Sequence, residues 1–260
     1  MPEGIEAETA RSLIERRALG RKIVAVDVPD AWFLKRGLTP RRARRALQGC
    51  TTVEARRRGK LILVDTDGPT IGLHLGMSGR ILVDDEAAGD PLLYASNKAN
   101  PKWVRFALRF ADGGSLALRD PRRLGAVTLD PDEDRLGPDA FALTPAQLLD
   151  AIGSSTAPLK AALMNQGKIA GIGNLLADEI LWRAGLDPAR EAASLDDTEM
   201  RRLHRTIAKV LVELSARGGS HTGDLMAARV PGGLCPKDGT PLIRRTVGGR
   251  TTFSCPKHQR

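Results

Sequence analysis

The pattern of apolar residues changes about halfway along the chain. Residues 24–28 carry valine at every second position, and residues 104–110 alternate Val, Phe, Leu and Phe with Arg, Ala and Arg. A period of two is typical of half-buried strands. A short apolar run at 61–64 and the pair Leu116 and Leu118 extend the pattern. The first half therefore predicts mostly antiparallel β structure.

The second half has helical spacing. Thr144-Pro145 predicts an N-cap followed by proline at the first helical position, and further helices are predicted over 159–166 and 174–184. A longer helix is expected from about Ser194, and its apolar face comprises Leu203, Ile207, Val210, Leu211 and Leu214. In the first half, the only predicted helix covers residues 6–18.

These patterns predict an α+β protein with two domains. Residues 1–130 form an N-terminal β-sandwich domain, and 131–142 form an acidic, turn-rich linker. Residues 143–226 form a helical domain, and 227–260 form a C-terminal β-hairpin with its turn at Gly248-Gly249.

Composition narrows the class of partner. The chain has 260 residues, and 40 Lys+Arg against 31 Asp+Glu give a net charge of +9, which favours a polyanion, nucleic acid before an anionic membrane surface. Aromatic residues make up 3%, too few for a single-strand binder built on stacking platforms.

No apolar run reaches the length of a membrane span, there is no signal-peptide pattern, and three cysteines form no disulfide framework. We therefore expect a cytoplasmic protein of a reducing compartment that makes no membrane contact.

The chain begins Met1-Pro2-Glu3-Gly4-Ile5-Glu6. Removal of the initiator methionine before proline would leave Pro2 as a secondary amine, which can attack a sugar carbon and form an iminium. Its α-amino pKa of about 8 leaves a usable unprotonated fraction near pH 7. Glu3 and Glu6 offer carboxylates for proton transfer. The alternative is an exposed terminus without chemistry.

Further motifs follow in order along the chain. They are Arg57-Arg58-Gly59-Lys60, His74-Leu75-Gly76-Met77-Ser78-Gly79-Arg80, Asp120-Pro121-Arg122-Arg123-Leu124-Gly125, Gly171-Ile172-Gly173-Asn174 and a C-terminal cysteine pair. Together with Pro2-Glu3, this series resembles the formamidopyrimidine-DNA glycosylase and endonuclease VIII family of base-excision repair enzymes. The resemblance extends from Pro2 to Gln259.

The resemblance implies roles for individual residues. Pro2 would be the nucleophile, Glu3 would supply a proton to the opening sugar, and Glu6 would support it. Lys60 would bind a phosphate and donate a proton in β-elimination, and Arg250 would grip the lesion phosphate and donate in δ-elimination. For Lys60 the alternative is a solvated basic edge.

The expected DNA contacts form a second group of residues. Met77, Arg122 and Leu124 would fill the void left by a flipped base. The third position of this triad is usually aromatic in the family, so Leu124 leaves the opposite base undefined. Asn174 would hold a backbone phosphate in a helix–two-turn–helix, and His74 and Arg123 are also expected to contact DNA. Taken singly, Met77 and Leu124 are also consistent with core positions.

The C-terminal hairpin departs from the family's C-x2-C-x16-C-x2-C zinc motif. The spacing is kept, but the four positions hold Cys235, Asp238, Cys255 and His258. Zinc accepts all three ligand types, so we expect one structural Zn²⁺; the alternative is a hairpin that folds without metal.

The predicted function is that of a monomeric base-excision repair DNA glycosylase with abasic-site lyase activity, acting on damaged double-stranded DNA by β,δ-elimination. Only fourteen residues separate Ser220 from Cys235, whereas the family that the chain resembles usually has a longer stretch there, including a loop that closes over a flipped oxidised purine. The expected substrate is therefore an oxidised pyrimidine or an abasic site rather than 8-oxoguanine. Two alternatives remain, a catalytically reduced damage- or abasic-site-binding protein on the same scaffold and a helix–two-turn–helix nucleic-acid module.

Overall fold

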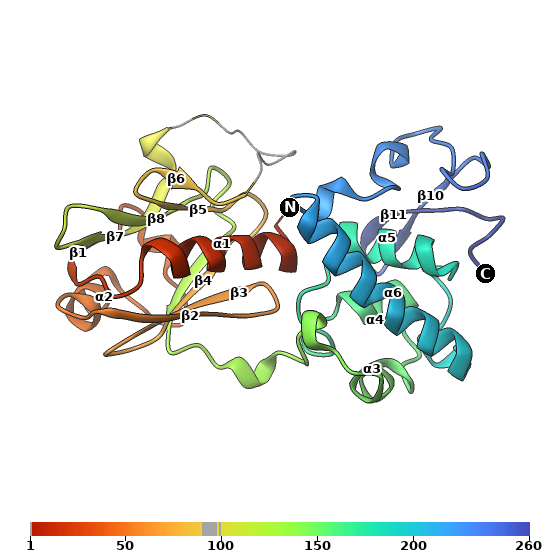
Figure 1. Ribbon diagram of the computed structural model, residues 1–260, viewed down its shortest axis with the longest axis horizontal. Coiled ribbons are helices and arrows are strands. Elements are labelled where there is room, and N and C mark those ends of the chain that lie inside the picture. The colour runs from red at the N-terminus through yellow and green to blue at the C-terminus, as the bar shows by residue number, and fades with distance from the viewer. Residues whose placement is uncertain (1, 90–97, 99) are drawn as a thin grey trace. The chain divides into compact units, whose positions relative to one another are not determined.

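The computed structural model describes residues 2–89, 98 and 100–260, and the chain divides into two compact units. One unit contains Pro2 and Glu6–Glu133, and the other contains Glu3–Ile5 and Asp134–Arg260. Figure 1 shows strands predominating in the first and helices in the second. The boundary lies inside the acidic segment that the sequence suggested as a linker, and the finer division into four parts stays a prediction.

The first unit is built on two antiparallel sheets. One sheet has the strand order β1 (Ile23–Asp27), β7 (Val104–Phe110), β8 (Ser115–Arg119), β5 (Arg80–Val83) and β6 (Glu86–Ala87). The other has the order β2 (Thr52–Arg58), β3 (Leu61–Thr66), β4 (Ile71–His74) and β9 (Ala126–Leu129). Apolar residues from both sheets form a single core with α1 (Gly4–Arg17) and α2 (Pro40–Leu47), which confirms the predicted antiparallel β fold.

Two local features of this unit differ from the sequence prediction. Val24 is 43% exposed whereas Val26 is buried, because a β-bulge between Ile23 and Ala25 shifts the register of β1 against β7. Helix α2 was not predicted, although its start carries a clear signal. Thr39 caps it by accepting from the Arg42 amide, and proline follows at the first helical position.

The second unit contains α3 (Pro145–Ile152), α4 (Leu159–Met164), α5 (Asn174–Ala184) and α6 (Asp197–Ala216) around one core. The Thr144 N-cap is confirmed as a capping box with Gln147, and the predicted apolar face of α6 is buried. Helix α6 begins three residues later than predicted, because 192–194 form a separate 3₁₀ turn and Asp196 provides the cap. In Figure 1, α5 lies beside α6 and the C-terminal hairpin.

The predicted C-terminal hairpin consists of β10 (Ile243–Val247) and β11 (Arg250–Ser254). Gly248 and Gly249 have φ of 56° and 73°, as the two central residues of a type I′ turn require. The short 3₁₀ helices are η1 (Ala31–Phe33), η2 (Pro101–Trp103), η3 (Glu133–Arg135), η4 (Ala140–Ala142), η5 (Ala192–Ser194), η6 (Ser220–Thr222) and η7 (Met226–Ala228). None of the helices among the described residues has the length and apolarity to cross a membrane.

Candidate functional site

Glu3 is held at the N-terminus of helix α5. Its side chain is fully buried, and its carboxylate accepts backbone N–H bonds from Gly173 at 2.9 Å, Leu175 at 2.8 Å and Leu176 at 3.1 Å. Three such donors and the positive end of the helix dipole stabilise a carboxylate. The anion expected at this helix start was a DNA phosphate, yet the described structure places a carboxylate of the same chain there.

The glycines of residues 171–174 make this arrangement possible. A Cβ on Gly173 would lie 2.3 Å from Cδ of Glu3, so only glycine allows the carboxylate to reach the helix N-terminus. The Gly4 amide donates to the Gly171 carbonyl at 2.9 Å and fixes the same segment. Asn174 begins the helix, and its Oδ1 is buried without a hydrogen-bond partner among the described residues. This oxygen can accept a hydrogen bond from a ligand donor, whereas a phosphate would be bound through the Asn174 Nδ2 donor.

Three further predicted catalytic residues, Pro2, Glu6 and Lys60, lie in the first unit. Pro2 is buried, and Glu6 lies in the first turn of α1. Lys60 occupies the two-residue turn that joins β2 to β3, where Gly59 has φ of 61°. The turn fixes the lysine at the end of a rigid hairpin.

The pKa of His74, at the end of β4, is affected by the charge of Lys60. The pKa of His74 is lowered by desolvation and by the Lys60 ammonium. Because the His74 side chain is exposed, repulsion by the Lys60 ammonium is the more important of these two causes of the lowered pKa. The Gly76 amide donates to Nδ1 of His74 at 3.0 Å, which leaves Nε2 to carry the proton of the neutral ring.

Asp120 organises the two loops that carry the predicted void-filling residues. Its fully buried carboxylate accepts from the backbone amides of Arg122 at 3.0 Å, Leu124 at 2.7 Å and Gly125 at 2.8 Å. The Ser78 hydroxyl donates to the same carboxylate and so joins the loop of Met77 to that of Leu124. Arg122 and Leu124 are exposed, and Met77 is half-buried.

The two loops also touch directly. A Cβ on Gly76 would lie 2.3 Å from the carbonyl of Leu124, and Gly76 has φ of 60°, so glycine is required twice over. The structure thus brings Met77, Arg122 and Leu124 together on one rigid assembly of loops.

Arg123 makes its contacts within the protein. Its guanidinium binds both carboxylate oxygens of Asp30, at 2.6 and 2.8 Å, and this hydrogen-bonded pair lowers the pKa of Asp30. Arg123 has φ of 58°, a conformation that non-glycine residues rarely adopt. The ion pair compensates this backbone strain and gives the loop a second attachment besides the Ser78–Asp120 hydrogen bond.

A buried ion-pair cluster supports the hairpin that carries Arg250. Lys160 of α4 and Asp178 of α5 are both fully buried, with Nζ 2.7 Å from Oδ1. Asp178 Oδ1 has no hydrogen-bond partner among the described residues. Its ion pair with the Lys160 ammonium therefore offsets the cost of burying its charge. Lys160 also donates to the Thr251 carbonyl at 3.1 Å and to Thr252 Oγ1 at 2.8 Å, next to the exposed Arg250. Arg229 completes the cluster by donating to Asp178 Oδ2 at 2.8 and 3.0 Å.

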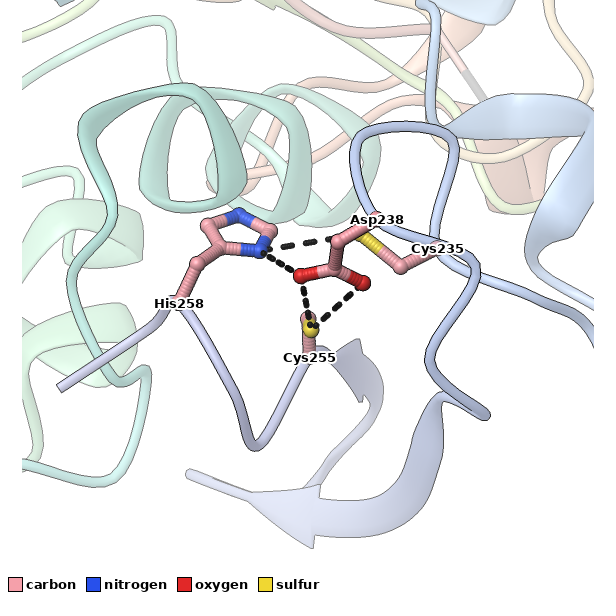
Figure 2. Close-up of side chains that lie close together, drawn as sticks. All are labelled: Cys235, Asp238, Cys255 and His258. Atoms are coloured by element: carbon pink, nitrogen blue, oxygen red, sulfur yellow. Dashed lines mark hydrogen bonds and ion pairs between the residues drawn. The ribbon is translucent and has the colours of Figure 1, made fainter.

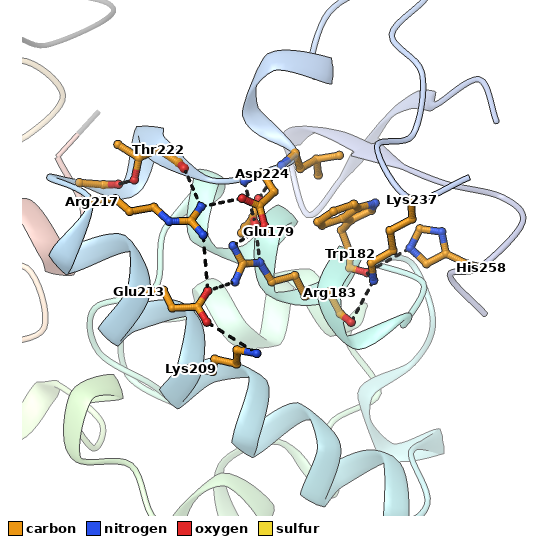
Figure 3. Close-up of polar contacts among 12 residues, drawn as sticks. Glu179, Trp182, Arg183, Lys209, Glu213, Arg217, Thr222, Asp224, Lys237 and His258 are labelled. Atoms are coloured by element: carbon orange, nitrogen blue, oxygen red, sulfur yellow. Dashed lines mark hydrogen bonds and ion pairs between the residues drawn. The ribbon is translucent and has the colours of Figure 1, made fainter. Parts of the chain in front are cut away.

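The next residue of α5, Glu179, anchors the short segment after α6. Its carboxylate accepts from the amides of Asp224 at 3.0 Å and Leu225 at 2.9 Å. Figure 3 shows Arg183 between Glu179, Glu213 and Asp224, with Arg217 joining the same group. Together with Arg229, these contacts fasten the segment between Ser220 and Cys235 to the helical core.

Four side chains at the base of the hairpin converge on one point (Figure 2). Cys235 Sγ is 3.6 Å from His258 Nδ1, Cys255 Sγ is 3.4 Å from an Asp238 oxygen, and that oxygen is 3.2 Å from His258 Nδ1. With Zn–S of about 2.3 Å and Zn–N or Zn–O of about 2.0–2.1 Å, a tetrahedron has edges of roughly 3.5 Å between sulfur and nitrogen or oxygen and roughly 3.3 Å between nitrogen and oxygen. The three distances are close to these edges and all four donor atoms lie within 4.8 Å of one another, so the cluster could hold a tetrahedral metal ion.

The surroundings of this cluster are also those of a metal site. His258 Nε2 lies 3.1 Å from the Trp182 carbonyl, a contact that directs Nδ1 toward the other three donors. The Trp182 indole donates to Cys235 Sγ at 3.3 Å. Hydrogen bonds of this kind orient metal ligands.

Comparison with known proteins decides the family. The formamidopyrimidine-DNA glycosylase N-terminal domain profile matches residues 1–127, and the formamidopyrimidine-DNA glycosylase H2TH domain profile matches residues 136–224. The chain belongs to the formamidopyrimidine-DNA glycosylase family. It is accordingly a DNA glycosylase of base-excision repair with abasic-site lyase activity, as the sequence motifs predicted.

The similarity to individual relatives extends over the whole length of both chains. A formamidopyrimidine-DNA glycosylase from Cereibacter sphaeroides is 36% identical and one from Bacillus licheniformis is 31% identical, each alignment covering 100% of both chains. A crystal structure of LlFpg with THF-DNA and an inhibitor has a TM-score of 0.84 at 25% identity, covering 100% of both chains. The complex of Lactococcus lactis Fpg with abasic-site DNA has a TM-score of 0.83 at 23% identity and the same coverage.

Several supporting residues escaped the sequence analysis. Asp120 was noticed only as part of a motif, and Asp30, Asp178 and Glu179 were not singled out. Consecutive acidic residues in an otherwise apolar helix, as in Ala177-Asp178-Glu179-Ile180, are the signal that could have found the last two, because buried carboxylates require partners.

Proposed function

We propose that Pro2 is the nucleophile of this glycosylase and that Glu3 is its proton-exchange partner. The observation that carries the proposal is the buried Glu3 carboxylate, which three backbone amides fix one residue after the proline. A carboxylate immobilised in this way needs no reorganisation during the reaction.

The reaction begins at the anomeric carbon of the damaged nucleotide. The Pro2 nitrogen forms a bond to C1′ while the bond between C1′ and the base breaks, and the departing base takes a proton from solvent. The Glu3 carboxylate accepts the proton that the Pro2 nitrogen loses and passes it to the sugar ring oxygen as the ring opens, and Glu6 supports this exchange. The secondary amine then forms a cationic iminium with C1′, which acts as an electron sink.

Strand cleavage follows from the iminium. Loss of a proton from C2′ expels the 3′ phosphate, and a second elimination expels the 5′ phosphate. Lys60, fixed at the turn between β2 and β3, serves the first elimination as phosphate ligand and proton donor. Arg250, at the start of β11, holds the lesion phosphate for the second. Cations at these positions offset the charge that develops on the leaving phosphates.

DNA contacts are assigned to the loops that Asp120 joins and to the start of α5. Met77, Arg122 and Leu124 enter the space of the extruded base, which offsets an unstacking cost of a few kcal/mol. Neutral His74 donates from Nε2 to a phosphate, and the Asn174 amide holds another. The tight pairing of Arg123 with Asp30 supports a bracing role for this arginine in addition to any DNA contact.

The preferred lesion is an abasic site or an oxidised pyrimidine. The short segment between Ser220 and Cys235 is fastened by Glu179, Arg183 and Arg229, which leaves little chain for a loop that closes over a purine. Among related structures, Lactococcus lactis Fpg has been crystallised with abasic-site, oxidised-pyrimidine and FAPY-dG DNA, so the lesion assignment rests on the short segment of this chain and not on those complexes.

The cofactor is one structural zinc ion. Cys235, Asp238, Cys255 and His258 would hold it, and the spacing of their donor atoms supports the assignment. The ion would cross-link the two ends of the hairpin to each other and supplies no step of the reaction.

Borohydride trapping tests the assignment of Pro2. Wild type and Pro2→Gly are incubated with borohydride and duplexes that contain an abasic site, an oxidised pyrimidine or 8-oxoguanine. We expect a Pro2-dependent covalent adduct with the first two duplexes and little with the third. Intact mass spectrometry checks that Pro2 is the mature N-terminus, as this chemistry requires.

Each other outcome has a defined meaning. An equal adduct with Pro2→Gly would assign the nucleophile to another amine. Efficient trapping on 8-oxoguanine would refute the argument from the short segment. Binding of abasic DNA without any adduct would support the damage-binding alternative.

A further inference from the structure

Trp32 is a large aromatic residue that the fold leaves in solvent. It is 66% exposed, while its neighbour Phe33 is fully buried in the core of the first unit. A single exposed apolar side chain is ordinary at a protein surface, so a contact role for Trp32 depends on how its ring is held and on the charge beside it. The assignments above give this residue no role.

The segment around Trp32 is fastened along the loop of Leu124. Asp30 accepts from both the Arg123 guanidinium and the Trp32 amide. A Cβ on Gly125 would lie 2.6 Å from the Phe33 ring, and the Lys35 amide donates to the Val127 carbonyl at 3.0 Å. Trp32 is therefore carried by the same rigid assembly as Leu124, which is itself 48% exposed.

Lys35 holds a positive charge against the indole ring. Its ammonium lies 4.0 Å from the ring centroid and donates to the Trp32 carbonyl at 2.7 Å. This cation–π pair fixes the ring before any partner arrives, which lowers the entropy cost of using it.

The positive charge of the segment that carries Trp32 and Lys35 favours a polyanionic partner. Residues 31–53 contain six Lys and Arg residues and no Asp or Glu, and Asp30 is already paired with Arg123. An aromatic ring beside a fixed ammonium in such a stretch combines base stacking with phosphate attraction.

We propose that Trp32 and Lys35 form an additional DNA contact beside the void-filling loop, where the indole stacks on an unpaired base or sugar and the ammonium binds the adjacent phosphate. The inference rests on the proposed function, because it requires that Leu124 enter damaged DNA. In this proposal, Trp32 provides the aromatic side chain for stacking that Leu124, as an aliphatic residue, cannot provide.

Binding of a duplex with a tetrahydrofuran abasic analogue, followed by fluorescence anisotropy, tests the contact. Loss of one aromatic–base stack predicts that Trp32→Ala weakens binding by about 5- to 150-fold. Trp32→Phe should recover most of the affinity. Val53→Ala, which removes a 58% exposed residue from β2, is the matched control and should leave the affinity within about twofold of wild type.

The Lys35 contact is tested by salt dependence. Lys35→Met should reduce the slope of log K against log salt by about one, the value for one lost phosphate contact. Substituting 2-aminopurine for the base opposite the analogue adds a direct readout, because stacking on Trp32 would quench its fluorescence and Trp32→Ala would restore it.

The outcomes separate this inference from the proposed function. If wild type traps on abasic DNA through Pro2 and Trp32→Ala binds as tightly as wild type, the Trp32 contact is refuted and the catalytic assignment stands. If wild type neither prefers the abasic duplex nor traps on it, both fail. An unchanged salt slope for Lys35→Met would remove the phosphate contact.

Discussion

Replacing Asp178 with asparagine removes the negative charge from the buried ion-pair cluster. Lys160 and Arg229 would then be two buried cations without their counter-charge, since Lys160 is fully buried and Arg229 is 8% exposed. Burial already lowers the pKa of Lys160 whereas the Asp178 carboxylate raises it, so desolvation of the ammonium is a real cost at this site. The shape of the side chain hardly changes, and the effect is therefore electrostatic.

The expected magnitude follows from the burial. Breaking a buried pair by removing one partner costs about 3–5 kcal/mol, because an uncompensated charge stays in the interior. For a protein of this size, 1 kcal/mol corresponds to about 2–4 °C in melting temperature. We therefore expect Asp178→Asn to lower the melting temperature of the helical unit by roughly 6–20 °C.

Thermal unfolding of the full chain, followed by circular dichroism, measures the effect. Lys209→Met is the control, because Lys209 is 72% exposed and lies 3.6 Å from Glu213, a surface pair worth about 0–1 kcal/mol. Adding Lys160→Met to Asp178→Asn removes one unpaired cation and should restore part of the loss. A drop below about 1 kcal/mol for Asp178→Asn, or a double variant no more stable than the single one, would refute the electrostatic account.

Three further predictions concern the site. In Gly173→Ala the new Cβ would lie 2.3 Å from Glu3 Cδ, so the Glu3 carboxylate must move. Because a catalytic group would be displaced, we expect borohydride trapping to be about 100-fold slower, while the circular dichroism spectrum stays unchanged. Metal analysis should find one zinc ion per chain, and Asp238→Cys should bind it more tightly in a chelator competition; wild type without zinc would contradict the assignment. The Asp30–Arg123 pair lowers the pKa of Asp30, so its stabilisation is present above the unfolded value of about 3.9 and is lost as pH falls through the lowered folded value. Asp30→Asn should therefore be less stable than wild type at pH 6 and should approach it as pH falls below the folded pKa of Asp30, whereas a stability gap that persists at the lowest pH at which both proteins fold would contradict this pairing.

Features encoded by local pattern could be predicted from the sequence. Alternation in 104–110 identified β7, a threonine before proline identified the start of α3, and the paired glycines at 248–249 identified the hairpin turn. Each of these depends on residues close together in the chain. The convergence of Cys235, Asp238, Cys255 and His258 could be predicted for the same reason, because their spacing within one hairpin is local.

Features that depend on long-range contacts could not be predicted in this way. Glu3 binds amides some 170 residues away, and neither segment alone indicates the other. A glycine-rich helix start favours any anion, so the sequence could not distinguish a phosphate from a carboxylate of the same chain. The bulge that exposes Val24 likewise arises from pairing with β7 and is not visible in the valine pattern.

Helix α5 connects the candidate metal cluster to the residues proposed for the chemistry. Its first residues fix Glu3, Asp178 holds the strand next to Arg250, and the Trp182 carbonyl orients His258. If the proposed zinc ion is bound, its loss would free the base of the hairpin and, through β11, the position of Arg250. The loops of Met77 and Leu124 are held by Asp120 in the other unit and do not depend on these contacts. Zinc removal should consequently reduce δ-elimination while the void-filling loops keep their structure.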